Sequence, residues 1–140
     1  MPGLVNLKGL WKNSLRRMVQ AEVVAVLGKK LENRELHLIK PVSRVMLRGE
    51  IHELILTDEK NAGPEKKVNR IAYLCFFEVK ESGLLLVGDK IWRGQTLLGE
   101  VAGFDETHAP NHLNVLIVGQ NLLSGRRLGL RLGDYLCVKE

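Results

Sequence analysis

Apolar and polar residues alternate along most of the chain beyond residue 18, which is the pattern of strands that bury one face. The first run covers residues 18–28, where Val23, Val24 and Val26 supply the β-branched side chains that favour strands. Shorter runs follow at close spacing, and most of them are bounded by glycine. The runs predict strands at residues 36–40, 45–57, 68–79, 84–87, 90–92, 96–102, 113–118, 127–132 and 135–138. Many short strands with glycine turns predict an all-β fold.

Four stretches refine this prediction. Residues 68–79 are the most apolar and are expected to form the central strand of the core. Gly49, in the middle of the 45–57 run, predicts a bend that lets one long strand serve two parts of a barrel. Residues 57–67 are polar and are expected to form the longest exposed loop. Residues 1–13 fit either a short N-terminal helix or an extended segment, within a lead-in that covers residues 1–17.

Two segments share an ending in which Gly-Asp follows an apolar residue, and these are Gly88-Asp89 and Gly133-Asp134. Glycine can adopt a positive φ, and the aspartate can accept hydrogen bonds from backbone N–H groups across the turn. The pair resembles the Gly-Asp box of cradle-loop and related small β-barrels, in which two such turns are related by pseudo-symmetry. This resemblance implies a small closed or partly open β-barrel over residues 18–138, with both aspartates in structural roles.

Length and composition fit one globular domain over residues 1–140, with 45% apolar and 26% charged residues. The longest apolar runs are far shorter than the roughly 20 residues of a membrane-spanning helix, so we expect a cytoplasmic protein without a membrane segment. Cys75 and Cys137 lie in no CxxC or Cys/His metal pattern, and we expect them to be free thiols. Gly-rich phosphate loops, nucleophile elbows and HExxH motifs are also absent from the sequence, which removes the standard nucleotide-binding and hydrolase signatures.

The net charge of +5 comes from the first part of the chain, where residues 1–50 contain ten Lys/Arg and four Asp/Glu. If Arg16, Arg17, Lys29 and Lys30 shared one face, that face would suit a phosphate backbone. Aromatic residues make up only 5%, which leaves no stacking platform for bases. A solvated strand face is therefore the simpler interpretation, and a nucleic-acid or ribosome-associated barrel is the second alternative for function.

The richest chemistry lies between Phe104 and Asn114, where two histidines, two carboxylates and two amides occur close together. Pro110 favours a tight turn, which would bring His108 and His112 within about 5 Å of each other across antiparallel strands. The sharper hypothesis is a site for Zn²⁺ or a similar divalent metal, formed by both histidines with Asp105 or Glu106. The simpler hypothesis is a loop held together by hydrogen bonds.

A second candidate pair is Glu50 and His52, which would share one face of a strand while Ile51 and Glu53 share the other. If they line a cavity, they could act as an acid/base pair or join His108 and His112. A cross-strand salt bridge is the more common arrangement for such a pair.

Three segments, residues 48–57, 71–79 and 103–114, together resemble a family of small bacterial proteins known only as a domain of unknown function. The resemblance covers roughly residues 18–138. It implies a self-contained domain with a recurring turn around residues 105–114, and it implies no activity.

We therefore predict a small non-enzymatic binding or accessory module that works through the Asp105–His112 loop together with Glu50 and His52. The first alternative is a metal-dependent enzyme with His108, His112 and a carboxylate as ligands and Glu50 or Glu106 as general base. Exposed sheet edges also suggest a homo-oligomer or a protein partner.

Overall fold

The computed structural model describes residues 15–140, so the short N-terminal helix considered for residues 1–13 lies outside the described residues. Strands dominate the described chain, and one helical turn, α2 (Gly125–Leu128), lies near its end. The strands are β1 (Gln20–Val26), β2 (Lys30–Leu31), β3 (Leu36–His37), β4 (Ser43–Met46), β5 (Ile51–Thr57), β6 (Lys67–Val68), β7 (Ile71–Glu81), β8 (Gly83–Leu86), β9 (Lys90–Arg93), β10 (Thr96–Asp105), β11 (Asn114–Val118) and β12 (Tyr135–Lys139). The predicted all-β class is confirmed.

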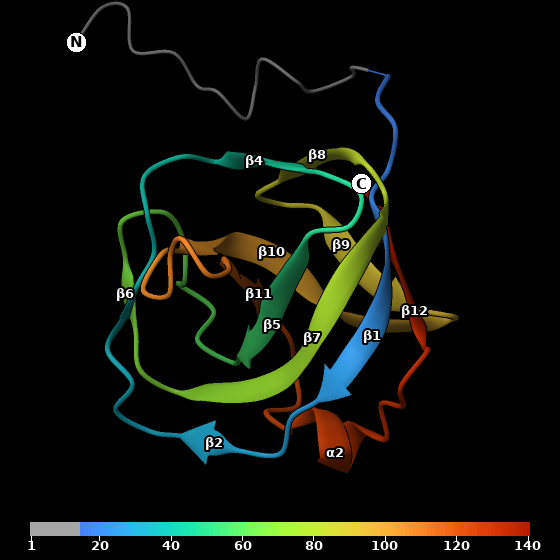
Figure 1. The fold of residues 1–140 in the computed structure, drawn as a ribbon. Coiled ribbons are helices and arrows are strands. Elements are labelled where there is room, and N and C mark those ends of the chain that lie inside the picture. Colours follow the sequence, from blue (N-terminus) through green and yellow to red (C-terminus); the bar gives the residue numbers. More distant parts are fainter. Residues whose placement is uncertain (1–14) are drawn as a thin grey trace, which may run out of the picture.

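Seven strands pair into a ring in the order β1, β12, β9, β10, β11, β5, β7 and back to β1 (Figure 1). Within this ring β5 and β11 run parallel, whereas the other neighbours are antiparallel. The longest strand, β7, pairs with β1, β5 and β2, which agrees with the central position expected for residues 68–79. The arrangement fits the predicted small, partly open β-barrel.

Two apolar clusters lie on opposite sides of the sheet. The larger cluster receives side chains from every strand of the ring and fills its interior. The smaller one lies outside the ring, where Leu36, Leu38 and Val68 from the covering segments pack on Ile55 and Leu116. Because β5 and β11 are buried on both faces here, their sequences are nearly continuous apolar runs instead of clean alternations.

Both Gly-Asp turns have the same internal hydrogen bonds, as the sequence pattern predicts. Gly88 and Gly133 have φ values of 99° and 88°, in the left-handed region that favours glycine. Asp89 accepts a hydrogen bond from the Leu86 N–H at 2.9 Å, and Asp134 accepts one from the Arg131 N–H at 2.8 Å. In each turn the aspartate side chain therefore closes a loop onto the backbone three residues earlier.

A third turn of this kind occurs before β5, with glutamate in place of aspartate. Gly49 has φ 93°, and Glu50 accepts a hydrogen bond from the Leu47 N–H at 2.9 Å. The Glu50 N–H in turn donates to the Leu47 carbonyl at 3.0 Å. Because glutamate stands where the other two turns have aspartate, the Gly-Asp pattern does not identify this turn in the sequence. The backbone conformation of the turn nevertheless matches that of the other two.

Each of the three turn carboxylates also holds a nitrogen-bearing side chain. Asp89 forms a buried two-pronged ion pair with Arg16. Asp134 pairs with Arg93 at 2.8 Å nearer the surface, and Glu50 lies 3.2 Å from the imidazole of His52. The turns therefore fasten separate parts of the chain to the barrel.

Two strand predictions are wrong in detail. Residues 45–57 do not form one bent strand, because the turn at Gly49 separates β4, which pairs with β8, from β5 in the ring. Residues 127–132 form no strand, because Ser124 caps the single helical turn α2 and Gly129 ends it at φ 78°.

Candidate functional site

A row of four side-chain positions crosses the outer face of the ring, as the strand registers show. Asp105 on β10 is paired with Asn114 on β11, Asn114 with Glu53 on β5, and Glu53 with Phe76 on β7. Asn114 and Glu53 lie two residues before Leu116 and Ile55, which belong to the outer apolar cluster, so they share that face. Three of the four are polar and almost fully buried.

The loop between β10 and β11 carries His108 and His112. It turns at residues 107–111, where the Asn111 N–H donates to the His108 carbonyl at 2.8 Å. The imidazole rings of the two histidines stack with centroids 5.0 Å apart, close to the separation expected from the sequence. The rings of Phe76 and His112 meet in a T-shaped arrangement, with centroids 4.9 Å apart.

His112 lies between two oxygen acceptors. Its Nδ1 is 2.6 Å from Asn111 Oδ1, and its Nε2 is 3.0 Å from Glu53 Oε1. When Nδ1–H donates to Asn111, the lone pair of Nε2 points at the Glu53 carboxylate. A lone pair on the imidazole nitrogen and a carboxylate oxygen that lie 3.0 Å apart repel each other unless a proton or a cation lies between them. A partner oxygen on the far nitrogen is also the usual way in which a metal-binding histidine is oriented.

Glu53, His108 and His112 each place one donor atom within 4.8 Å of the others. Glu53 is 5% exposed, whereas His108 is exposed, so the cluster reaches from the buried row to the surface. Donor atoms of a tetrahedral zinc site lie roughly 3.3 Å apart, because Zn–N and Zn–O bonds are about 2.0–2.1 Å. The donor-atom separations would have to shorten by at most about 1.5 Å to reach such a geometry, and His108 lies in the exposed loop.

The two acidic residues predicted as metal ligands lie elsewhere. Asp105 is buried, and it accepts hydrogen bonds from the Thr107 N–H at 3.2 Å, the Thr107 hydroxyl at 2.8 Å and the Asn114 side-chain amide at 2.8 Å. Glu106 is exposed at the start of the turn. Neither belongs to the cluster, and the buried carboxylate beside the histidines is that of Glu53.

Glu50 and His52 form a separate pair that joins β5 to the loop. His52 Nδ1 accepts a hydrogen bond from the Leu113 N–H at 3.0 Å, so its other nitrogen is the donor to Glu50. Burial lowers the pKa of His52, which keeps the ring neutral for this acceptor role, although Glu50 acts in the opposite direction. Partial burial acts to raise the pKa of Glu50, but the Leu47 N–H and His52 outweigh it and lower that pKa. Both ring nitrogens of His52 are thus engaged.

Glu53 is the residue that the sequence pattern did not single out. The alternation of faces along the strand correctly puts Glu53 on the face opposite His52. It also puts Glu53 on the same face as Ile51, and it does not show that this face is exposed at Ile51 but buried at Glu53. The signal that could have found it is a carboxylate in the apolar run 51–56, since Glu is rarely buried without a partner.

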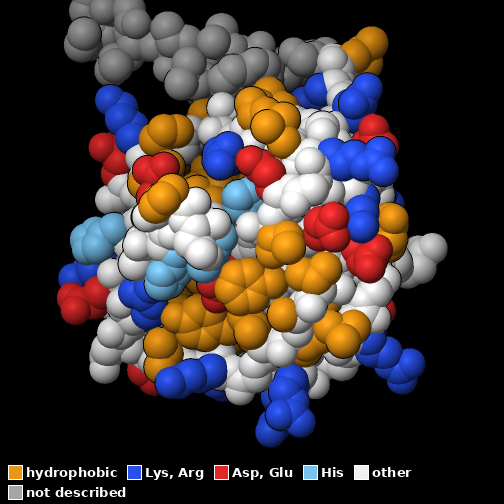
Figure 2. Space-filling model, in the orientation of Figure 1, with side chains coloured by type: hydrophobic (Ala, Val, Ile, Leu, Met, Phe, Trp, Pro, Cys, Tyr) orange, Lys and Arg blue, Asp and Glu red, His pale blue; other side chains and the backbone are white. Residues whose placement is uncertain are grey.

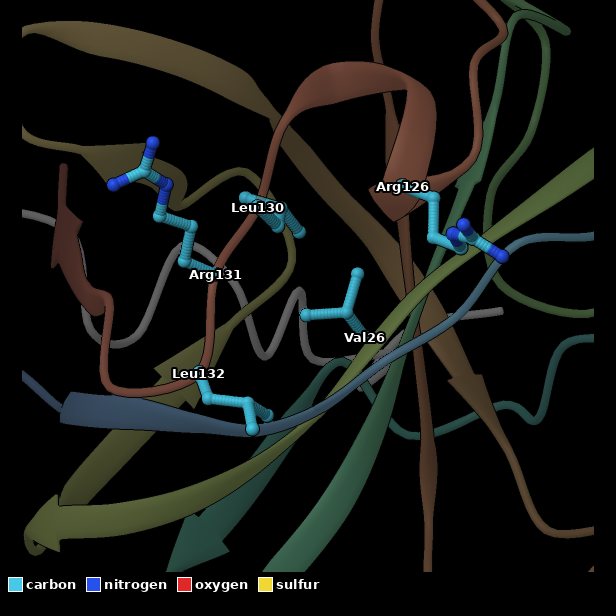
Figure 3. A pocket seen from close by; sticks show the side chains of 5 residues that line it. All are labelled: Val26, Arg126, Leu130, Arg131 and Leu132. Atoms are coloured by element: carbon cyan, nitrogen blue, oxygen red, sulfur yellow. The ribbon is translucent and has the colours of Figure 1, made fainter.

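Histidine side chains on the face in Figure 2 lie beside a hydrophobic surface patch. A different part of the surface, shown in Figure 3, has an open hollow in which Arg126 and Arg131 flank Val26, Leu130 and Leu132. The residues lining this hollow include neither a carboxylate nor a histidine, so the hollow lacks groups for acid–base or metal chemistry.

The basic residues considered for a phosphate-binding face, Arg16, Arg17, Lys29 and Lys30, do not lie together in the described part of the chain. Arg16 is buried in its ion pair with Asp89, and Arg17 lies 3.4 Å from Glu81. Lys30 belongs to β2, at the opposite end of the molecule from β8, where Arg16 bonds the Leu84 carbonyl (Figure 1). A phosphate-binding face would therefore have to use Lys29 and Lys30 without the two arginines.

Within residues 15–140, no helix has the length and apolar character needed to cross a membrane. No curated protein and no solved structure matches the chain. Residues 13–139 match a family of unknown function, DUF6917, which agrees with the resemblance to an uncharacterised domain. That match takes in the whole ring together with the Glu53, His108 and His112 cluster, and the chain belongs to the DUF6917 family.

Proposed function

We propose that this protein is a small binding module whose Asp105–His112 loop, together with Glu53, holds a divalent transition-metal ion. The observation that carries the proposal is the convergence of two imidazoles and one buried carboxylate within 4.8 Å. Two histidines and one carboxylate are a ligand set for Zn²⁺, Fe²⁺ and related ions, and three protein ligands leave positions open for an outside ligand.

The surroundings of the cluster support binding. Glu53 is held on β5 at the centre of three paired strands, so its carboxylate is fixed by the sheet. His112 is oriented by Asn111 on one side and by the Phe76 ring on another. The exposed His108 supplies the adjustable ligand and a path for the ion from solvent.

The same geometry argues for a binding role over the metal-dependent enzyme. Glu50, the candidate general base, bonds the Leu47 N–H and lies beside His52, and His52 is bonded to the Leu113 backbone. Glu106, the other candidate base, is exposed and outside the cluster. The proposed role is therefore metal-dependent recognition of an outside ligand or partner at the open positions.

The test is metal binding by purified, untagged protein, measured by elemental analysis and by calorimetric titration with Zn²⁺. We expect near-stoichiometric binding by the wild type and a loss of at least tenfold in affinity for His108→Ala, His112→Ala and Glu53→Gln. His37→Ala is the matched control, because His37 is an exposed histidine on β3 outside the cluster and its removal should change nothing. Wild-type protein that binds no divalent transition metal under these conditions would overturn the proposal.

A further inference from the structure

Asn114 is an unusual residue in the buried row. It is 1% exposed at the start of β11, and its side-chain nitrogen donates to Asp105 Oδ2 at 2.8 Å. Its side-chain oxygen, Oδ1, is also buried and has no hydrogen-bond partner among residues 15–140. Nearly all buried polar atoms of native proteins are paired with protein or water, so an orphaned oxygen at this depth calls for an explanation.

The orientation of the Asn114 amide is fixed by its neighbour. Asp105 accepts hydrogen bonds and has no hydrogen of its own when ionised, so the atom that faces it must be the NH₂ group. Thr107 holds Asp105 in place through two further hydrogen bonds. The amide nitrogen is thus held toward Asp105 on β10. Because the oxygen and nitrogen of an amide diverge from the same carbon, Oδ1 is directed away from the Asp105 carboxylate, and the other neighbour of β11 is β5.

The neighbour of Asn114 on β5 is Glu53. The two residues are direct partners in the parallel register, and both lie on the outer face of the sheet. An orphaned carbonyl oxygen and a buried carboxylate thus occupy adjacent positions, with His112 bonded to the carboxylate. Two buried acceptors next to each other are energetically unfavourable when no donor or positive charge faces them. The same two oxygens are suitable ligands for a metal ion.

We infer that Asn114 Oδ1 is a fourth protein ligand of the same metal site, an inference that rests on the proposed function. The ligand set is then two imidazole nitrogens, one carboxylate oxygen and one amide oxygen. Amide and carboxylate oxygens suit Mn²⁺, and imidazole is shared with Fe²⁺ and Zn²⁺. The two oxygen donors favour an ion that accepts octahedral coordination, such as Mn²⁺, in which four protein ligands leave two positions for solvent or an outside ligand.

This assignment gives Asp105 a different task from the one predicted. Asp105 is a positioning residue, because it turns the Asn114 oxygen toward the site without touching the ion. The Thr107 hydroxyl and N–H hold Asp105 in turn. The Asp105–Thr107–Asn114 group therefore explains why the loop is rich in polar residues although only its two histidines reach the metal.

The test compares Mn²⁺ and Zn²⁺ in the intact protein. Free Mn²⁺ is followed by electron paramagnetic resonance and Zn²⁺ by calorimetry, for the wild type and for Asn114→Leu. This substitution keeps the number and branching of the side-chain heavy atoms but removes the oxygen, together with the NH₂ group that donates to Asp105. We expect Mn²⁺ affinity to fall by at least tenfold in Asn114→Leu and Zn²⁺ affinity to fall less, because three ligands and water still satisfy tetrahedral zinc. If Asn114 had only a structural role, Asn114→Leu would lower the affinities for Mn²⁺ and Zn²⁺ by the same factor.

A second variant covers the case in which Asn114→Leu does not fold. Asn114→Ala also removes the amide oxygen, and its smaller side chain avoids the overpacking that leucine could cause, so Mn²⁺ affinity should again fall by at least tenfold. Asn121→Ala makes the same change in the exposed loop after β11 and should leave Mn²⁺ affinity unchanged. Circular dichroism on each variant confirms folding.

The outcomes separate the two proposals. Failure of the wild type to bind either metal overturns the proposed function and this inference with it. Metal binding that is the same in the wild type, Asn114→Leu and Asn114→Ala overturns the inference and leaves the proposed function standing. Zinc binding without manganese binding by the wild type also overturns the inference.

Discussion

Replacing Asp89 by asparagine removes one charge from a buried ion pair and leaves the other in place. The side chains of Asp89 and Arg16 are 4% and 9% exposed. Asp89 Oδ2 accepts hydrogen bonds from the Leu86 N–H at 2.9 Å and from Arg16 at 3.0 Å, and Oδ1 accepts a second bond from Arg16. In Asp89→Asn the amide can keep the Leu86 contact, but its NH₂ group then faces the arginine, donor against donor.

The magnitude follows from what remains around Arg16. The Leu84 carbonyl still accepts from it at 2.7 Å, and the exposed Glu140 lies 3.7 Å away. Breaking a buried pair by removing one partner costs about 3–5 kcal/mol. Because these two contacts remain, we expect the lower end, about 3 kcal/mol, which is a large part of the roughly 5–15 kcal/mol that stabilises a typical domain. At a few degrees per kcal/mol for a chain of this size, the melting temperature should fall by about 10 °C.

The matched control is Asp134→Asn, in the turn with the same backbone geometry. Asp134 and its partner Arg93 have side chains that are 21% and 30% exposed, so its loss should cost about 1 kcal/mol. Urea unfolding at neutral pH, followed by tryptophan fluorescence and circular dichroism, measures both values. Equal destabilisation of the two variants would refute the argument that burial sets the cost of this contact. In Arg16→Met/Asp89→Asn the two costs should fall short of additivity, because the orphaned charge is gone.

Two further predictions concern groups packed against the barrel. Burial raises the pKa of the Cys75 thiol to about 12, so Cys137→Ser protein should resist Ellman's reagent at pH 8 when native and react fully in denaturant; rapid labelling of the native protein would contradict this. Gly125→Ala should destabilise the protein by about 3 kcal/mol in urea unfolding, because the new Cβ would lie 1.9 Å from the Leu74 carbonyl oxygen, whereas Gly63→Ala has open space and should be nearly neutral.

The sequence pattern predicts the class of the fold well, because its information is local. Alternation marks the strands, and the Gly-Asp dipeptides mark two turns whose φ values and hydrogen bonds the structure confirms. The errors arise where local pattern competes with tertiary context. Residues 127–132 alternate like a strand, but Ser124 and Gly129 cap a helical turn there. At Gly49 the pattern predicts only a bend within one strand and misses the full turn, because Glu50 replaces aspartate in the repeat.

The candidate site was only half predictable for a related reason. The two histidines lie four residues apart, so a single proline turn suffices to place them near each other. Glu53 and Asn114 come from distant strands, and only the register of β5 on β11 makes them neighbours. Pattern along the chain gives the face of each residue but not its partner on the next strand.

The parallel pairing of β5 and β11 has a consequence for how the protein folds. Glu53 and His112 are 59 residues apart in sequence, and the chain must pass through β7 to β10 before β11 can reach β5. Contacts at such separation incur a loop-closure entropy before any interaction compensates for it, and they are typical of slow-folding topologies. The cluster therefore forms only after β11 has paired with β5. A partly folded state that lacks β11 would not contain it.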